Sequence, residues 1–193
     1  MTNFDDSFYE DQVFKKIDAT KAILIEKEFY GCTFSNCDFS ESNLTNTVFE
    51  DCIFKNCNFS LIKVLNTSFR TVEFKSCKIM GISFCQVDTF SLDIKFNNSK
   101  LQTCSFFELD LHGSCFKDCQ ILECDFIKTN LKNANLKNVD LSHTKFQDAN
   151  LEKANLSGAQ NYEINPLINK ITGAKFSLPE AISLLKGFQI KLD

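Results

Sequence analysis

The sequence predicts an all-β solenoid, in which short extended segments wind around one axis and bury a regular series of side chains. The first observation is a period of five. A Phe, Leu, Ile or Val stands at all 25 repeat centres, which run from Phe29 to Phe84 and, in a shifted phase, from Phe96 to Leu156. The second observation is a small residue two positions before the centre in 20 of those 25 units. The third is the composition, with 21 Phe and no Trp in 193 residues, which suits the filling of one continuous core.

The five-residue period excludes the two regular elements that would otherwise bury such a series. Residues five apart in an α-helix point about 140° apart and build no stripe. In a flat strand they fall on alternate faces. Two inward residues with one outward residue between them match a short extended segment, and the two remaining outward residues require a corner. A chain of such units must wind around an axis, so the sequence favours a solenoid.

Several units carry a family resemblance. The units CDFSE, ANLKN, ANLEK and ANLSG resemble the pentapeptide repeat, whose commonest form is A(D/N)LXX, and the resemblance covers at least Phe29 to Leu156. It implies a right-handed quadrilateral β-helix of pentapeptide repeats with four units, or about 20 residues, per coil. Residues one coil apart would then stack. The predicted structural core contains Phe34, Phe39, Phe54, Phe59, Phe74, Phe106, Phe126 and Phe146.

The β-helix is expected to cover residues 1–176 as one domain. Residues 1–28 keep the phase only weakly and are interpreted as a degenerate first coil that covers the open end. The spacing of 12 between Phe84 and Phe96 places a two-residue phase break within residues 85–95, which should bulge or kink one face. Residues 159–176 leave the repeat gradually and are expected to form an irregular last coil.

Residues 177–193 are predicted to form a short C-terminal helix and a short strand. The SLPE segment that begins at Ser177 has the pattern of a capping box with proline in the first turn, and Gly187 is a natural stop. A helix of about ten residues follows from these signals. The alternation of apolar and polar residues in the FQIKL segment after Gly187 indicates the strand.

The C-terminal helix is also the expected dimer interface. In the proteins that this chain resembles, a helix in this place commonly joins two copies into a homodimer and caps the solenoid. The dimerisation residues are expected to be Leu178, Ile182, Leu185 and Phe188.

Ten cysteines raise the question of a metal site or of disulfides. Eight of them occupy the small inward position of the repeat, and no CxxC pair is present, so we expect them to be buried, reduced and free of metal. These eight are Cys32, Cys37, Cys52, Cys57, Cys77, Cys104, Cys119 and Cys124. Of the two that lie off this position, Cys85 and Cys115, the second is expected to be the exposed thiol.

No pattern in the sequence indicates catalysis. His112 and His143 fall on outward repeat positions, and no GxSxG, P-loop, glycine-rich dinucleotide fingerprint or HExxH motif is present. We therefore expect no catalytic residue, no metal and no cofactor, and the chain is predicted not to be an enzyme.

The chain also lacks the pattern of a membrane protein. No apolar run approaches the roughly 20 residues of a membrane span. The segment MTNFDDSFYEDQ is acidic where a signal peptide would be basic and then apolar. The expected location is the cytoplasm.

A functional branch of the family shares several features with this chain. The acidic N-terminus, the FxxCxF spacing, the phase break and the capped C-terminus resemble the Qnr-type proteins, although the long inserted loops of some members are absent. This resemblance implies a non-catalytic protein that binds DNA gyrase or topoisomerase IV as a partial DNA mimic and protects it from quinolones, without binding nucleic acid itself. The alternative is a rigid scaffold that binds some other protein.

The charge distribution restricts where DNA could be imitated. Residues 1–51 hold 11 acidic and 4 basic side chains, for a net charge of −7, whereas the remaining residues hold 14 and 17, for a net charge of +3. Duplex DNA as long as a tail-to-tail dimer, about 75 Å, carries on the order of 44 charges. A dimer would carry only −8, which is twice the net charge of −4 per chain. Because the negative charge lies in residues 1–51, mimicry of the charge of DNA is expected only at that end. The expected partner-binding residues there are Glu41, Glu50 and Asp51.

Overall fold

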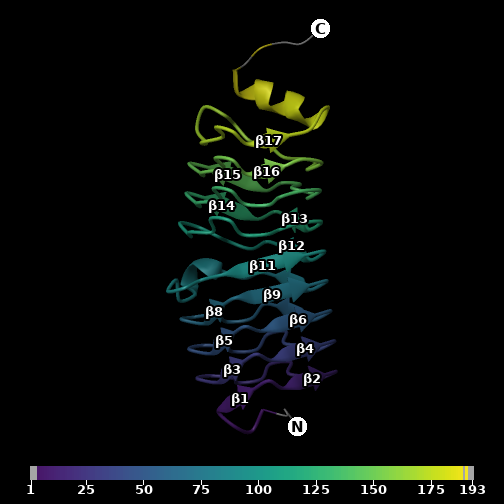
Figure 1. The fold of residues 1–193 in the computed structure, drawn as a ribbon, viewed down its shortest axis with the longest axis vertical. Coiled ribbons are helices and arrows are strands. Elements are labelled where there is room, and N and C mark those ends of the chain that lie inside the picture. Colours follow the sequence, from purple (N-terminus) through teal and green to yellow (C-terminus); the bar gives the residue numbers. More distant parts are fainter. Residues whose placement is uncertain (1–3, 189, 191–193) are drawn as a thin grey trace.

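The structure is a computed structural model that describes residues 4–188 and 190, and it is a parallel β-solenoid whose coils stack along one long axis (Figure 1). Each strand pairs with a strand of at least one adjacent coil, and every pairing between described strands is parallel. The prediction of an all-β solenoid is therefore confirmed.

Each coil has four faces, which we number in chain order. The first face contains β1 (Phe8–Glu10), β3 (Glu28–Tyr30), β5 (Val48–Glu50) and β8 (Ser68–Arg70). The second face contains β2 (Val13–Lys15), β4 (Thr33–Ser35), β6 (Ile53–Lys55), β9 (Val72–Lys75) and β11 (Ile94–Asn97), followed further along by β16 (Asn155–Leu156) and β17 (Lys175–Phe176).

The other two faces complete the quadrilateral. The third face contains β7 (Asn58–Ser60), β10 (Lys78–Met80), β12 (Lys100–Gln102) and β13 (Gln120–Leu122). The fourth face contains β14 (Asp125–Ile127) and β15 (Lys145–Gln147). On the N-terminal side of β14, neighbouring coils of the fourth face are joined by single parallel bridges, such as the bridge between Ile23 and Asn43.

The corner between two faces explains the five-residue period. The corner residue has its backbone in the left-handed region, with φ of 55° at Asn36 and 52° at Asn56. This conformation is unfavourable for a residue with a side chain, least so for asparagine. It is offset here because the corner amide is hydrogen-bonded to the next coil, as from Asn36 N to Lys55 O at 2.8 Å. One corner in every five residues turns the chain onto the next face.

The predicted core phenylalanines lie inside the solenoid. Each is 5% exposed or less, and rings one coil apart stack, as do Phe34 and Phe54 with centroids 4.7 Å apart. Rings on neighbouring faces of one coil meet edge to face, as do Phe54 and Phe59 at 4.9 Å. The aromatic part of the core is therefore a column of rings in contact both along and around the axis, while Leu131, Leu136, Leu141, Leu151 and Leu156 fill the coils towards the C-terminus.

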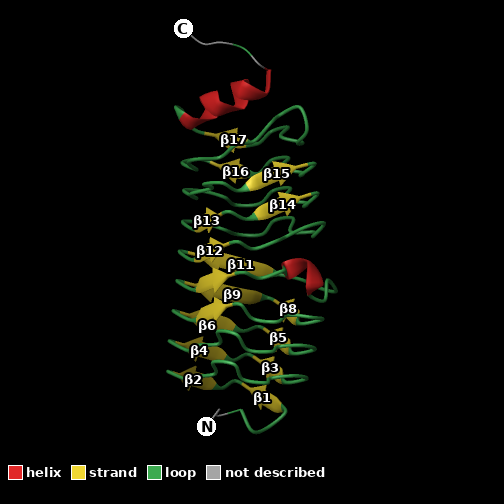
Figure 2. Ribbon diagram, turned by 180° about the vertical axis from the view of Figure 1, so that it is seen from behind, coloured by secondary structure: helices red, strands yellow, loops and turns green. Residues whose placement is uncertain are grey.

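The phase break is a loop that protrudes from the first face. Phe54 pairs with Phe74, a shift of 20, but Phe74 pairs with Phe96, a shift of 22. Asp88 still bridges to Ser68 in the regular register, so the two extra residues lie between Asp88 and Ile94. The 3-10 helix η1 (Phe84–Gln86) precedes this loop, and both project from the side of the rod (Figure 2).

The N-terminal coil is more regular than its sequence suggests. The inward positions Tyr9, Phe14, Ala19 and Leu24 are all buried, and β1 and β2 pair in register with the next coil. The ring of Phe4 lies over this coil and approaches the Phe14 ring to 5.1 Å. An aromatic side chain thus closes this end of the core.

The C-terminal end is closed by the 3-10 helix η2 (Glu180–Phe188), which lies across the last coil and packs Leu184 against the core (Figure 1). The side chain of Ser177 does not cap the helix, because its Oγ accepts a hydrogen bond from Gly158 N at 3.0 Å. The amide of Ala181 instead donates to the Ser177 carbonyl at 3.0 Å.

The predicted C-terminal strand is only partly within the described residues. Phe188 is the last residue of η2 rather than part of a strand, and Ile190 belongs to no strand. Leu192 lies outside the described residues.

Candidate protein-interaction surface

Among residues 4–188 and 190, no three His, Cys, Asp or Glu side chains are placed to hold a metal ion. Within the same residues, no helix has the length and apolar character needed to cross a membrane.

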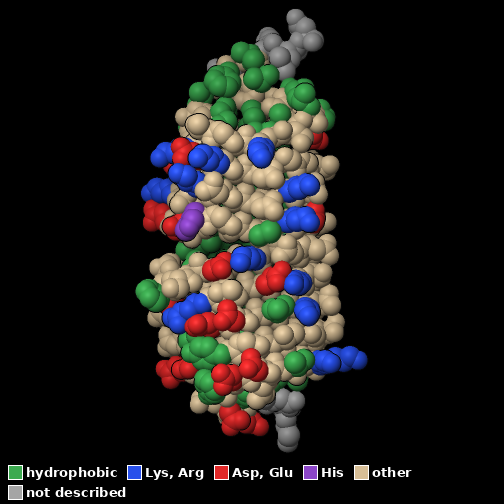
Figure 3. Space-filling view, in the orientation of Figure 1, with side chains coloured by type: hydrophobic (Ala, Val, Ile, Leu, Met, Phe, Trp, Pro, Cys, Tyr) green, Lys and Arg blue, Asp and Glu red, His purple; other side chains and the backbone are tan. Residues whose placement is uncertain are grey.

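The N-terminal half of the first face combines acidic and aromatic side chains. Phe8 is 51% exposed, and its ring lies 5.5 Å from that of Tyr30. The Tyr30 hydroxyl donates to Glu28 Oε2 at 3.3 Å, and partial burial, followed by the Glu28 charge, raises the pKa of Tyr30. Glu10 and Glu50 lie in line with Tyr30 on the coils before and after it. Figure 3 shows red and green side chains gathered at this end of the face.

The loop at the phase break is fixed to the same face by Arg70. One guanidinium nitrogen donates to Glu50 Oε2 at 3.3 Å, and another lies 3.8 Å from Asp88 Oδ2. Asp88 also accepts hydrogen bonds from Phe90 N at 3.0 Å and Ser68 Oγ at 2.8 Å, and these contacts, with the nearby Arg70 charge, lower its pKa. The Arg70 guanidinium carbon lies 5.7 Å from the centre of the Phe90 ring. The loop therefore holds Phe90 outward, with the side chain 72% exposed.

The structure does not bring the three predicted partner-binding residues together. Glu50 and Asp51 are adjacent, at the end of the first face and the following corner. Glu41 occupies the corner between the third and fourth faces, which is diagonally opposite, and its carboxylate lies 3.6 Å from Lys21 Nζ. Glu41 therefore cannot contact the same flat partner surface as the other two.

The sequence analysis did not select Phe8, Arg70 or Phe90. Phe8 could have been found, because a phenylalanine at an outward repeat position is unusual beside buried centres. Phe90 carried a weaker signal, an aromatic residue inside the two-residue insertion. Arg70 carried none, since its role depends on the path of the loop.

The predicted dimerisation residues form an apolar surface at the C-terminal end. Leu178 is 78% exposed, Ile182 46% and Phe188 51%, while Leu185 is half-buried. Exposed Leu167 and Ile168 of the last coil add to the apolar residues near this end of the rod. Figure 3 shows the resulting green region at the top of the rod.

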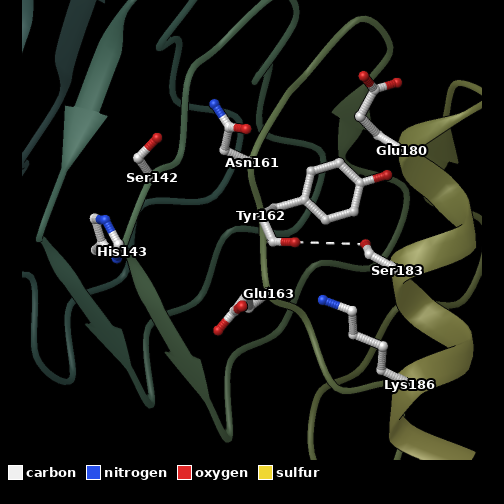
Figure 4. Close-up of a pocket in the computed structure, with 8 residues that line it drawn as sticks. All are labelled: Ser142, His143, Asn161, Tyr162, Glu163, Glu180, Ser183 and Lys186. Carbon is white, nitrogen blue, oxygen red and sulfur yellow. Dashed lines mark hydrogen bonds between the residues drawn. The ribbon is translucent and has the colours of Figure 1, made fainter.

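A cavity of about 420 Å³ lies where η2 rests on the last two coils (Figure 4). Ser183 Oγ donates to the Tyr162 carbonyl at 3.4 Å across it, and Lys186 extends from the helix side. The Tyr162 hydroxyl is buried with no hydrogen-bond partner among the described residues, and burial raises its pKa. Few polar contacts among the described residues therefore join η2 to the last two coils of the solenoid.

The cysteines differ sharply in exposure. The eight inward thiols are buried, whereas Cys85 is exposed and Cys115 is half-buried, its Sγ 3.6 Å from Asn97 Oδ1. The expectation that Cys115 would be the more exposed of the two is therefore wrong. The cause is local, because η1 turns Cys85 outward while Cys115 packs beside Asn97 and Asn135.

We predict that thiol reagents will distinguish these groups. Burial raises the pKa of Cys52 and of Cys119 to about 12, so both should be protonated as well as shielded at pH 8. In the native protein iodoacetamide should modify Cys85 first, and the inward cysteines should react only after unfolding. Mass spectrometry of digests would check this. Fast modification of the inward set, bound zinc in a native spectrum, or a mass lower by two per disulfide would contradict it.

A filled core wound from repeated four-faced coils defines a repeat protein of the solenoid class. The model of the pentapeptide repeat region matches residues 27–106 and 99–176. The chain therefore belongs to the pentapeptide repeat family. No curated protein matches it in a sequence comparison.

Solved structures show the same fold. Two trypsin-treated variants of QnrB1, a plasmid-mediated fluoroquinolone resistance protein, are similar to this chain. One is 22% identical with a TM-score of 0.62, covering 100% of this chain and 93% of its own. The other is 20% identical with a TM-score of 0.57, covering 96% of this chain and 100% of its own. At this level of identity the likeness concerns the fold.

Proposed function

We propose that the chain is a non-catalytic binding protein that docks on a type II DNA topoisomerase, DNA gyrase or topoisomerase IV, and shields it from quinolones. The observation that carries this proposal is the joint placement of carboxylates and exposed aromatic rings on the first face of a rigid rod. The fold shared with QnrB1, a fluoroquinolone resistance protein, supports it.

Electrostatics favour the N-terminal half of the first face as the docking surface. Glu10, Glu28 and Glu50 lie on it, within the segment that carries a net charge of −7. The DNA-binding surface of a topoisomerase is lined with Lys and Arg, so opposite charges would steer the encounter. The rod is thus a partial DNA mimic, acidic at one end only.

Two aromatic side chains supply the apolar part of the contact. Phe8 and Phe90 project from the first face, and the Arg70 and Asp88 contacts hold the loop of Phe90 in place before binding. Large aromatic residues on ordered surfaces dominate many protein interfaces, because little conformational freedom is lost on binding.

Binding to purified DNA gyrase tests the proposal. Immobilised protein should retain gyrase at 50 mM salt and lose most of it at several-fold higher salt, since exposed charge contacts are screened. Addition of the protein should also preserve supercoiling activity in the presence of a quinolone. The Phe90→Ala variant should bind about 10-fold more weakly. If neither gyrase nor topoisomerase IV shows salt-sensitive binding, the rigid-scaffold alternative becomes the better one.

The scaffold alternative has one observation in its favour. Beyond residue 51 the chain has a net charge of +3, so most of the rod does not imitate DNA. A scaffold would bind a different protein, and its binding would not compete with DNA for gyrase. We propose a cytoplasmic location, where reduced thiols are the rule.

We further propose that the C-terminal apolar surface joins two copies into a homodimer. Leu178, Ile182 and Phe188 would otherwise remain exposed to water at the end of the rod. Light scattering should report a dimer for the full chain and a monomer or aggregate for a chain ending at Phe176. If the shortened chain is still a dimer, the interface must lie outside the C-terminal apolar surface.

A further inference from the structure

The fourth face carries an apolar row that the repeat does not require. On six consecutive coils, the outward position directly after the buried centre holds an apolar, thiol or threonine side chain. We call this row the fourth-face stripe; its members are Ile25, Thr45, Leu65, Cys85, Phe107 and Ile127. The equivalent positions on the second face include Lys15, Lys55 and Lys75. The stripe therefore has no counterpart on the second face.

The stripe is accessible along its length. Leu65 is 50% exposed, Ile25 and Phe107 are each 39% exposed, and Cys85 between them is exposed as well. The Thr45 hydroxyl donates to Asn43 Oδ1 at 2.7 Å, so its one hydrogen-bond donor is already used. A row of mainly apolar side chains on the surface of a repeat protein marks a contact surface.

Two pairs of opposite charges lie beside the stripe. Lys128 Nζ lies 3.0 Å from Glu108 Oε1 and 5.6 Å from the centre of the Phe107 ring. Lys145 Nζ lies 3.8 Å from Asp125 Oδ1. Unlike the acidic first face, this surface therefore has no excess charge that calls for a charged partner.

We propose that the fourth-face stripe binds an amphipathic α-helix of a partner protein. Addition of a strand is disfavoured because the backbone is already used, as where Glu26 N donates to Thr45 O at 3.1 Å and Asn46 N to Leu65 O at 2.9 Å. A helix resting on the stripe covers one row and needs no backbone hydrogen bond.

A second copy of the chain fits the stripe less well. Packing of two flat faces would also cover the outward row before the centres, which includes Lys63, Asp125 and Lys145, and burying these charges is costly. The stripe alone is one side chain wide, whereas a stable interface between two copies buries roughly 800 Å² per partner.

The dimensions also agree with a helix. Six coils span five steps of about 4.8 Å, or about 24 Å. A helix of about 16 residues has this length, and because its pitch of about 5.4 Å exceeds the coil spacing of about 4.8 Å, about five of its side chains would face the six coils. The partner segment is therefore a helix of four to five turns, on the order of 16 to 18 residues, with one narrow apolar stripe.

The test uses a fluorescent 18-residue helical peptide with leucine at the first and fourth positions of each heptad and Glu and Lys elsewhere. Fluorescence anisotropy should report a dissociation constant on the order of 10 μM for the parent protein. The Leu65→Glu and Phe107→Glu variants should each bind at least about 10-fold more weakly. Bound peptide should also slow iodoacetamide modification of Cys85 several-fold.

Matched controls make the result specific. Val13→Glu places the same charge on a more exposed apolar residue of the second face and should leave binding unchanged. A peptide of the same composition with scrambled order should not bind. Absence of binding to the parent, or equal binding to the parent and Phe107→Glu, overturns the proposal. A change of oligomeric state in Phe107→Glu by light scattering, without loss of peptide binding, would assign the stripe to contact between copies instead.

Discussion

Replacing Phe54 with alanine is expected to lower the free energy of unfolding by about 3 to 5 kcal/mol, which is a large part of the stability of a protein this size. The Phe54 side chain is fully buried, and its ring stacks on those of Phe34 and Phe74 with centroids 4.7 and 5.1 Å away. The rings of Phe49 and Phe59 meet it edge to face at 5.3 and 4.9 Å. Alanine would leave a cavity inside a rigid column that cannot collapse around it.

Urea unfolding monitored by circular dichroism would measure this loss. The matched control is Phe90→Ala, which removes the same ring from an exposed position and should cost less than about 1 kcal/mol. A Phe54→Ala variant that unfolds at the parent's midpoint would place Phe54 outside the core and shift the register of the whole coil.

Reversing two charges at the first face is expected to weaken gyrase binding by about 100-fold. The double variant Glu28→Lys with Asp51→Lys changes the acidic end without touching Glu50, whose pairing with Arg70 helps to hold the loop of Phe90. Lysine at both positions would repel the basic DNA-binding surface that the proposed function requires. Binding measured against salt concentration should show a shallower slope as well as lower affinity.

The control for this variant carries the same change in net charge on another corner. Glu41→Lys with Glu123→Lys alters two exposed residues of the corner between the third and fourth faces. Gyrase binding should be nearly unaffected, and circular dichroism should show the fold intact in both double variants. Equal losses in the two variants would indicate a response to net charge alone, and unchanged binding in the first would remove the first face from the proposed interface.

Much of the fold could be predicted because the repeat is a local constraint. One buried centre in every five residues requires a corner at a fixed distance, so the inward place of Phe34 or Phe126 follows from counting. The same counting could have separated Glu41 from Asp51, which lie half a coil apart. With 20 residues per coil, two residues ten apart must lie on opposite corners. The prediction that placed both residues in one site did not take this into account.

The sequence by itself determined the solenoid, its core and the position of the phase break, since each depends on spacing along the chain. Only the tertiary structure decided how Arg70 joins Glu50 to Asp88, because that contact requires the path of a loop that obeys no repeat. It also decided that Cys85 faces water while Cys115 is half-buried. Outward side chains do not pack in the core, so their neighbours are the outward side chains of adjacent coils, 18 to 22 residues away in the sequence. The phase break changes this separation, and the repeat alone does not show which residues it brings together.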